Sequence, residues 1–538
     1  MSVLIQNLPV LVQDVPLTQH VLAQETVQAP SVDYAAISPL LVLLAAACLG
    51  VLVEAFVPRS SRWAAQVGLS LAALVTAGVA LALHASASGR TDVQTLAGTL
   101  TVDRPALFLW GSLLVLAAAA VLLIADRSVE PGGAFLSDVT AGTVQSRQEA
   151  GARSTHTEVF PLTLFSLAGM MAFVAANDLL TMFVALEVLS LPLYLLCGLA
   201  RRRQLLSQEA ALKYFLLGAF ASAIFLYGLA LLYGYAGSVR LADIATAASG
   251  TDRSDILLFA GLAMLLVGLC FKASIGPFHT WTPDVYQGAP TPVTALMAAC
   301  TKVAAFGALL RVLHVGFAGV QWDWRPVMWA VAIISMVVGT IIGITQTDMK
   351  RLIAYSSVAH AGFILVGTIA ITPDGLSATL FYLLVYGLTV IAALGVVTLV
   401  RDSRGEAAHL SQWSGLGRRS PLVAGIFAFL MLSLAGIPLT GGFIAKFGVF
   451  SAGLQDGMAP LVVVGVLMSA VAAFFYLRVI VLMFFSEPAV DGPTVTVPGV
   501  FTTVAVGIGF LGTLVLGVVP GPVLDLSAVQ SFMSSLPS

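Results

Sequence analysis

Residues 271–296 read FKASIGPFHTWTPDVYQGAPTPVTAL, an apolar stretch interrupted by one lysine and four prolines. Each proline removes a backbone donor and disfavours a continuous helix. A second stretch, LAGIPLTGGFIAKFGVF at residues 434–450, carries a lysine beside a Gly/Pro interruption. Unwound backbone at membrane depth is tolerated only inside protein or beside water. The two stretches therefore predict discontinuous helices within a membrane protein, with Lys272 and Lys446 beside the interruptions.

The composition of the chain is that of an integral membrane protein. Of its 538 residues, 59% are hydrophobic and 10% are charged, whereas about 25% are charged in soluble domains. Such a chain needs lipid as its solvent. This excludes a soluble enzyme and a nucleic-acid-binding protein, and the net charge of −2 gives no reason to expect a polyanionic partner. The four cysteines form no C-x-x-C pair, so we expect no metal and no cofactor in this chain.

Apolar runs of about 20 residues predict an all-α protein with fourteen membrane helices, of which the seventh and twelfth are discontinuous. The predicted spans are 35–57, 63–86, 104–125, 158–176, 178–200, 209–235, 254–276, 291–315, 326–346, 351–371, 375–400, 421–453, 459–484 and 499–520. Residues 1–34 are an expected extracytoplasmic tail, and residues 126–157 an expected polar loop insertion. Three helices fill 35–125, and a last one spans 499–520.

The two halves of the chain are expected to be repeats of five helices, at 158–315 and 326–484. Glu187 and His360 are 173 residues apart, and Lys272 and Lys446 are 174 apart. The interruptions fall five spans apart. Because five is odd, the second copy is inverted in the membrane, as in transporters that carry their sites at broken helices.

The distribution of basic residues predicts the orientation. Fourteen lie in connections on the side opposite the termini and six on the side of the termini. Because basic residues collect on the cytoplasmic side, both termini are expected outside the cytoplasm of a bacterial cell.

Lysine and arginine are used differently. Four of the five lysines lie in apolar spans, whereas nineteen of the twenty arginines lie in loops or at helix ends. Arginine stays charged at any usable pH, but a desolvated lysine can release its proton. A charge in the middle of the bilayer costs about 3 kcal/mol on insertion scales. Four such lysines therefore indicate a function.

Six titratable residues within spans are the candidate proton carriers. They are Glu187, Lys213, Lys272, Lys302, His360 and Lys446. Glu187 needs a cation or a proton, and Lys213 on the next helix is a candidate partner. The sequence leaves other readings open: snorkelling of Lys213, a purely structural Glu187 ion pair, anion binding by Lys272, and a structural role for His360. Arg478 is a poor proton carrier, and His279 and His314 are weaker candidates.

Several of these segments resemble one known family. The helix of Glu187, Lys213, FKASIGPFHTWTPDVY, TKVAAFGALLR and GIPLTGGFIAKF resemble the antiporter-like subunits of respiratory complex I and of multisubunit cation/proton antiporters. The likeness covers about residues 158–484. Lys446 stands where M-type subunits carry glutamate, and few residues follow position 520, whereas L-type subunits end in a long lateral helix.

The resemblance implies a proton-pumping subunit in the membrane arm of NADH–quinone oxidoreductase, driven by quinone chemistry elsewhere. Glu187 and Lys213 would form a coupling pair, Lys272 and Lys302 a central axis, and Lys446 would lead towards the outlet. FMN, iron–sulfur clusters and quinone would bind to other subunits. M- and L-type subunits and small membrane subunits would be partners in the bacterial plasma membrane. A subunit of a Na⁺/H⁺ antiporter and a passive structural membrane protein are the alternatives.

Overall fold

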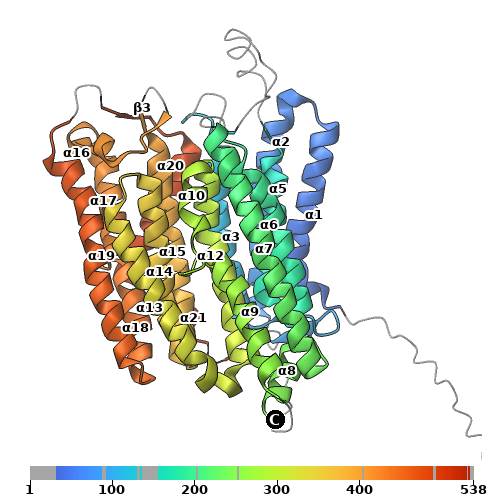
Figure 1. Ribbon diagram of the computed structural model, residues 1–538. Coiled ribbons are helices and arrows are strands. Elements are labelled where there is room, and N and C mark those ends of the chain that lie inside the picture. The colour runs from blue at the N-terminus through green and yellow to red at the C-terminus, as the bar shows by residue number, and fades with distance from the viewer. Residues whose placement is uncertain are drawn as a thin grey trace, which may run out of the picture.

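Long helices stand side by side through the whole computed structural model (Figure 1). It describes residues 32–87, 92–129, 134–135, 156–200, 204–250, 254–402, 405–488, 492–529 and 531–532. Most of the predicted N-terminal tail and of the predicted loop at 126–157 lies outside these residues. α13 packs on α14, α7 on α9, α5 on α6, α1 on α2 and α15 on α20. The predicted all-α membrane protein is thereby confirmed.

Eleven helical stretches in the described part of the chain are long and apolar enough to cross a membrane. They are α1 (Tyr34–Phe56), α2 (Arg59–Ser86), α3 (Arg104–Ala125), α6 (Leu179–Cys197), α7 (Gln204–Ala236), the stretch Thr291–Gly316, α13 (Gln321–Thr345), α14 (Met349–Ile369), α15 (Pro373–Leu399), α19 (Ala459–Phe485) and α20 (Val500–Val518). Shorter apolar helices occupy the other three predicted spans. These are α5 (Val159–Ala175), α9 (Ile256–Lys272) and α17 (Pro421–Ala435). By length, the described part of the chain thus holds eleven candidate spans, and the count of fourteen stays a prediction.

The backbone leaves the helix at both predicted interruptions. α9 ends at Lys272, and α10 (Trp281–Gly288) begins only after eight residues. The Gly276 N–H, which has no partner within a helix, donates to Ser335 Oγ on α13 at 3.1 Å. In the second half, α17 ends at Ala435, the following Gly436 has a φ of +84°, and α18 is Gly441–Gln455. Neighbouring side chains therefore replace helical hydrogen bonds inside the bundle, as a membrane interior requires.

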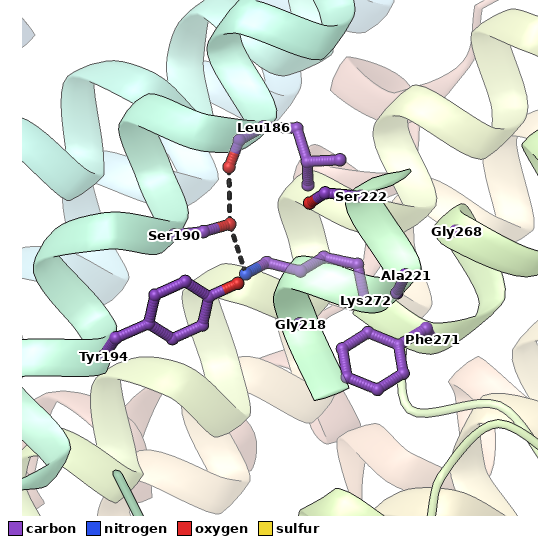
Figure 2. Close-up of a pocket in the computed structure, with 9 residues that line it drawn as sticks. All are labelled: Leu186, Ser190, Tyr194, Gly218, Ala221, Ser222, Gly268, Phe271 and Lys272. Atoms are coloured by element: carbon purple, nitrogen blue, oxygen red, sulfur yellow. Dashed lines mark hydrogen bonds between the residues drawn. The ribbon is translucent and has the colours of Figure 1, made fainter. Parts of the chain in front are cut away.

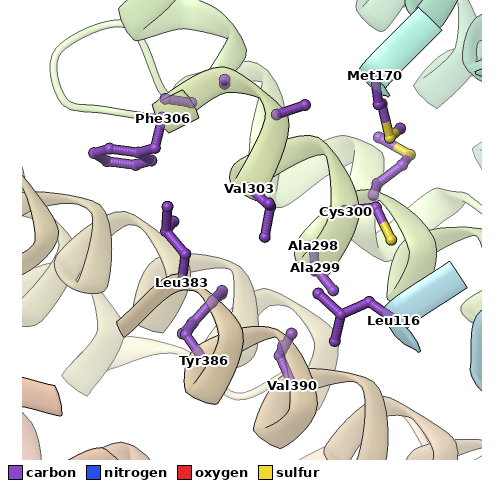
Figure 3. Close-up of a cluster of buried hydrophobic side chains, with 14 of the residues drawn as sticks. Leu116, Met170, Ala298, Ala299, Cys300, Val303, Phe306, Leu383, Tyr386 and Val390 are labelled. Carbon is purple, nitrogen blue, oxygen red and sulfur yellow. The ribbon is translucent and has the colours of Figure 1, made fainter. Parts of the chain in front are cut away.

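The centre of the bundle is the helical stretch that follows α10. It consists of α11 (Thr291–Leu296), the π-helical turn η1 (Met297–Thr301), α12 (Lys302–Arg311) and a second π-helical turn η2 (Val312–Gly316). Figure 3 shows Ala299, Val303 and Phe306 from this stretch among apolar side chains of its neighbours. Leu116 comes from α3, Met170 from α5, and Leu383, Tyr386 and Val390 from α15. A lysine on this stretch is shielded from lipid on every side.

Short elements close the two ends of the bundle. Strands β1 (Val93–Thr95) and β2 (Leu100–Val102) form a hairpin. Strand β3 (Val400–Asp402) pairs with β4 (Gly405–Glu406) and β5 (Thr494–Val495). The remaining short helices are α8 (Leu241–Ala248), η3 (Ala318–Val320), η4 (Leu410–Trp413), α16 (Leu416–Arg419) and α21 (Gly521–Ser527). Figure 1 places α8 and α21 at one end, and α10, α16 and β3 at the other.

Two helix pairs make the same close approach. Ser166 Oγ on α5 donates to Leu189 O on α6, and Ser335 Oγ on α13 donates to Val358 O on α14. Both bonds measure 2.8 Å and join residues 23 apart. Gly169 and Gly339 let the backbones meet, because a Cβ at either position would collide with the backbone of the facing helix.

Candidate functional site

Lys272 is the last residue of α9 and is 4% exposed. Its Nζ donates to Ser190 Oγ on α6 at 2.8 Å and to Tyr214 Oη on α7 at 3.0 Å. Figure 2 shows the lysine side chain reaching between these helices toward Ser190. The face of the Tyr214 ring lies 5.2 Å from Nζ. The lysine is therefore held by neutral hydroxyl groups and an aromatic face.

A small cavity lies beside Lys272. It has a volume of about 10 Å³ and is lined by Ser190, Tyr194, Ser222 and Lys272 among apolar residues. A volume of about 10–15 Å³ accommodates one water molecule when polar partners are present. The hydroxyls of Ser190 and Ser222 supply such partners. The site of Lys272 thus has room for one proton-exchanging water.

Lys302 is the first residue of α12 and is 2% exposed. Its Nζ donates to Ala273 O, just beyond the end of α9, at 3.1 Å, and to Ser357 O on α14 at 3.0 Å. The Tyr386 ring lies 5.5 Å from Nζ. Ala273 directly follows Lys272 in the chain. The carbonyl that Lys302 contacts therefore belongs to the residue next to Lys272.

His360 lies one turn along α14 from Ser357 and is 2% exposed. Its Nδ1 is 2.8 Å from Tyr382 Oη, and its Nε2 is 3.2 Å from Tyr476 Oη. Tyr476 is also hydrogen-bonded to Ser356 Oγ. Both ring nitrogens therefore face hydroxyls, which can donate or accept according to the tautomer.

Lys446 lies on α18 and is 5% exposed. Its Nζ donates to the carbonyl oxygens of Leu434 and Ala435 and to Ser469 Oγ, each at 2.9 Å. Both carbonyls end α17, so Lys446 caps the broken helix. Lys302 makes a similar contact at the first interruption, where it donates to the carbonyl of Ala273.

The predicted contact between Glu187 and Lys213 is not formed in the described part of the chain. Lys213 is 41% exposed, and its Nζ lies 2.7 Å from Glu209 Oε1 and 2.7 Å from Asp284 Oδ2. Glu187 Oε1 is buried without a hydrogen-bond partner. Glu187 lies one turn before Ser190 on α6, where its charge acts on Lys272. The sequence could not reveal Asp284 as a partner of Lys213, because it lies on another helix, 71 residues further along the chain.

Asp284 is a residue that sequence reasoning missed. It lies on α10, and its Oδ1 accepts from Arg351 Nη1 at 2.6 Å while its Oδ2 accepts from Lys213. Arg351 also donates to Gln287 Oε1 at 3.1 Å. Asp284 therefore joins α7 in the first half of the chain to α14 in the second. In the sequence, Asp284 could have been noticed as an acidic residue between the prolines of the first interruption.

Two basic residues that the sequence placed in connections are buried. Lys350 lies in the first turn of α14 and is 7% exposed. Arg311 ends α12 and forms a fully buried ion pair with Asp103, with Nη2 and Oδ1 2.8 Å apart. Arg311 Nε also donates to Val174 O at 2.9 Å. More charged side chains are thus buried than the sequence predicted, because the ends of some helices lie within the bundle.

No group of three or more His, Cys, Asp or Glu side chains converges as metal ligands would among the described residues. Lys272, Lys302, His360 and Lys446 are instead separate titratable groups that are hydrogen-bonded to hydroxyls or carbonyls. Such an arrangement can hold and pass protons.

A protein-family model described as the transmembrane part of NADH:quinone oxidoreductase and Mrp antiporters matches residues 176–475. The chain is 67% identical over 513 residues to NADH-quinone oxidoreductase subunit N of Saccharopolyspora erythraea, covering 94% of this chain and 99% of that relative. It is 56% identical to subunit N of Rhodococcus opacus, with 95% and 98% covered.

Solved structures resemble this fold over almost the whole chain. A chain of respiratory complex I from Thermus thermophilus is 33% identical with a TM-score of 0.74, and 91% of this chain and 99% of that chain are covered. A chain of the Mrp complex from a Dietzia species has a TM-score of 0.77 at 24% identity, with 92% and 96% covered. The second likeness speaks for the fold alone.

Proposed function

The chain belongs to the antiporter-like membrane subunits of the NADH:quinone oxidoreductase and Mrp antiporter family, and from this we propose that it translocates protons in the membrane arm of NADH–quinone oxidoreductase. The observation that carries the proposal is the row of buried groups Lys272, Lys302, His360 and Lys446. Each is hydrogen-bonded to neutral partners. A permanent ion pair would hold a proton in place, whereas neutral partners let it leave.

The partners of Lys272 suit both protonation states. An ammonium donates to Ser190 and Tyr214, and after losing its proton the amine accepts from the same hydroxyls, since hydroxyls both donate and accept. Ser469 can serve Lys446 in the same way. Neither lysine therefore loses all of its hydrogen bonds when the proton moves.

Electrostatic interactions couple the neighbouring groups. The charges of Lys302 and Lys446 both act on His360, and Glu187 acts on Lys272. A proton on either lysine disfavours a proton on His360, because like charges in a poorly screened interior repel. A proton on Glu187 instead removes the attraction between its carboxylate and the ammonium of Lys272. Quinone reduction on another subunit would start this sequence by changing the charge near Glu187 or Lys213.

The predicted assembly follows from the same proposal. The chain would lie in the bacterial plasma membrane beside M- and L-type subunits and small membrane subunits. FMN, iron–sulfur clusters and quinone would be held by other subunits. Fourteen passes would arise if α5, α9 and the α17–α18 pair also cross, with both termini outside the cytoplasm.

An inverted repeat is supported by the matched contacts of α5–α6 and α13–α14. Asp178 and Asp348, 170 residues apart, begin α6 and α14 as N-caps. This spacing matches Ser190, not Glu187, with His360. We therefore retain repeats at 158–315 and 326–484 but revise which residues correspond.

Replacing single lysines tests the proposed pump. Lys272→Met should lower NADH-driven proton pumping into inverted vesicles by about tenfold or more, since a barrier higher by only about 1.4 kcal/mol suffices. Lys272→Arg, which keeps the charge but not the exchangeable proton, should fail as well. Full pumping by Lys272→Met in an assembled complex would contradict the role of Lys272.

The family description also favours a second candidate, a subunit of a Na⁺/H⁺ antiporter. The same preparation separates the two. The tagged chain should co-purify with flavin, iron–sulfur absorbance and inhibitor-sensitive NADH–quinone reductase activity. Co-purification with membrane subunits alone, together with sodium-dependent proton exchange, would establish the antiporter instead.

A further inference from the structure

Lys350 is a buried cation that the proposed row of carriers does not use. Its Nζ donates to Ala289 O, after the end of α10, at 2.8 Å and to Thr291 Oγ1 at 3.2 Å. Burying a charged ammonium is costly unless its hydrogen bonds are satisfied.

Thr291 extends the contact of Lys350 towards the surface. Its Oγ1 donates to Glu406 Oε2 on β4 at 2.6 Å. Thr291 is 2% exposed, whereas Glu406 is half-buried. One hydroxyl thus accepts from a buried lysine and donates to a carboxylate near the end of the bundle.

A second cavity, of about 20 Å³, lies at the outer end of this chain of contacts. Its polar lining is Asp126, Thr398, Arg401, Glu406 and Thr502, and its volume is enough for about one water molecule. Burial acts to raise the pKa of Asp126, but hydrogen bonds from Ser128 and Thr502 outweigh it and lower that pKa below its usual value. The side chain of Asp126 therefore stays charged. Of the two acidic residues that line the cavity, Glu406 is the one that contacts Thr291.

Lys350 is the innermost residue of this series of contacts, and α14 leads from it towards Lys302. Ser357 lies seven residues after Lys350 and so on the same face of the helix, about 10 Å further along. Its carbonyl accepts from Lys302. Ser357 Oγ and Tyr386 Oη are both buried and interact with one another, but neither makes a hydrogen bond of good geometry. Ordered water is expected beside buried hydroxyls whose hydrogen bonds are incomplete.

We propose that Glu406, Thr291 and Lys350 form a proton-uptake path from the cavity beside β4 to Lys302. In each transfer Glu406 gives its proton to Thr291 Oγ1, and the hydroxyl proton of Thr291 passes to the neutral amine of Lys350. Glu406 ends as a carboxylate and Lys350 as an ammonium, which is the arrangement of donors in the structure. Water near Ser357 then carries the proton to Lys302. The path rests on the proposed function and supplies its uptake side.

Thr291→Val tests the path, because it removes the hydroxyl at nearly constant volume. In the whole complex, with amounts matched by NADH–ferricyanide reductase activity, we expect NADH-driven pumping into inverted vesicles to fall about fivefold or more. Thr291→Ser, which keeps the hydroxyl, should stay within about twofold of the parent. Equal pumping by Thr291→Val and the parent would overturn the path.

Glu406→Gln keeps the test decisive if Thr291→Val does not assemble. The glutamine oxygen still accepts from Thr291 but carries no proton, so pumping should fall. Asp402→Asn on β3 is the matched control, because it removes a charge from the same hairpin outside the path.

Lys302→Met separates the proposed uptake path from the proposed function. If it abolishes pumping while Glu406→Gln pumps normally, the path alone is wrong; if neither variant affects pumping, the proposed function fails as well.

Discussion

Lysine and arginine divide the buried cations of this chain between two tasks. Arg311 is fixed in an ion pair with Asp103, and both side chains are fully buried. Lys272, Lys302 and Lys446 donate instead to hydroxyls and carbonyls. The difference follows from chemistry, because a guanidinium cannot release its proton and binds a carboxylate through two parallel bonds. Arginine here forms a fixed ion pair, whereas the lysines make hydrogen bonds that suit the proposed proton transfer.

Arg311→Met should destabilise the folded chain by about 3–5 kcal/mol, because it leaves the Asp103 carboxylate buried without its cation. Thermal unfolding of the purified complex, followed through the tagged chain, measures this. The double variant Asp103→Asn/Arg311→Met should unfold at a higher temperature than Arg311→Met alone, since the asparagine can still cap α3 without a charge. Equal stability of the single and double variants would refute the argument.

The sequence identified the buried lysines but not the groups that contact them. Lys272, Lys302 and Lys446 stand out because a lysine in an apolar run is unusual. Asp284 lies within the first predicted interruption, and Lys350 just before a predicted span, where a charge is ordinary. Their partners are distant in sequence, as Lys213 and Asp284 are 71 residues apart. Such pairs follow from packing, which no periodicity of one segment encodes.

At the scale of helices, both interruptions use a lysine to replace a lost helical hydrogen bond. Lys302 donates to the carbonyl of Ala273, and Lys446 to those of Leu434 and Ala435. The position of each helix break could be predicted from the prolines and glycines, because these residues act on the local backbone. Which lysine caps each break depends on how the helices pack, and the local sequence does not determine this.

Close helix pairs depend on glycine at single positions. A Cβ on Gly169 would lie 2.5 Å from Leu189 N and 2.9 Å from Leu189 Cα. Gly169→Ala should therefore push α5 from α6 and lower the stability of the chain by about 1–3 kcal/mol. It should also weaken the bond from Ser166 to Leu189 O. Thermal unfolding of the purified complex would show the loss.

Gly78→Ala in α2 is the matched control for Gly169→Ala. A Cβ there meets nothing within 4 Å, and alanine favours a helix over glycine. Its unfolding temperature should equal or exceed that of the parent. A similar loss in both variants would mean that glycine acts through the backbone alone, not through the contact between α5 and α6.

At the scale of the whole molecule, buried titratable groups cross the bundle from the side of α6 and α7 to that of α18 and α19. The central stretch Thr291–Gly316 lies between them, and its predicted span at 291–315 agrees closely. Hydropathy fixed the spans because lipid demands about 20 apolar residues from each long helix. The order of groups across the bundle depends on which helices are neighbours, which hydropathy does not determine.

The two ends of the bundle should face opposite compartments, and the distribution of basic residues predicts which end faces the cytoplasm. Ser60 and Ser249 are exposed at positions that the fourteen-pass topology puts on opposite sides. With the exposed Cys48 replaced by serine, Ser249→Cys should react with a membrane-impermeant maleimide in intact spheroplasts. Ser60→Cys should react only in inverted vesicles, since the excess of basic residues on its side marks the cytoplasm. The reverse labelling would place the termini inside the cell. The cavity beside β4 would then face away from the compartment that supplies protons, and the uptake path would have to begin elsewhere.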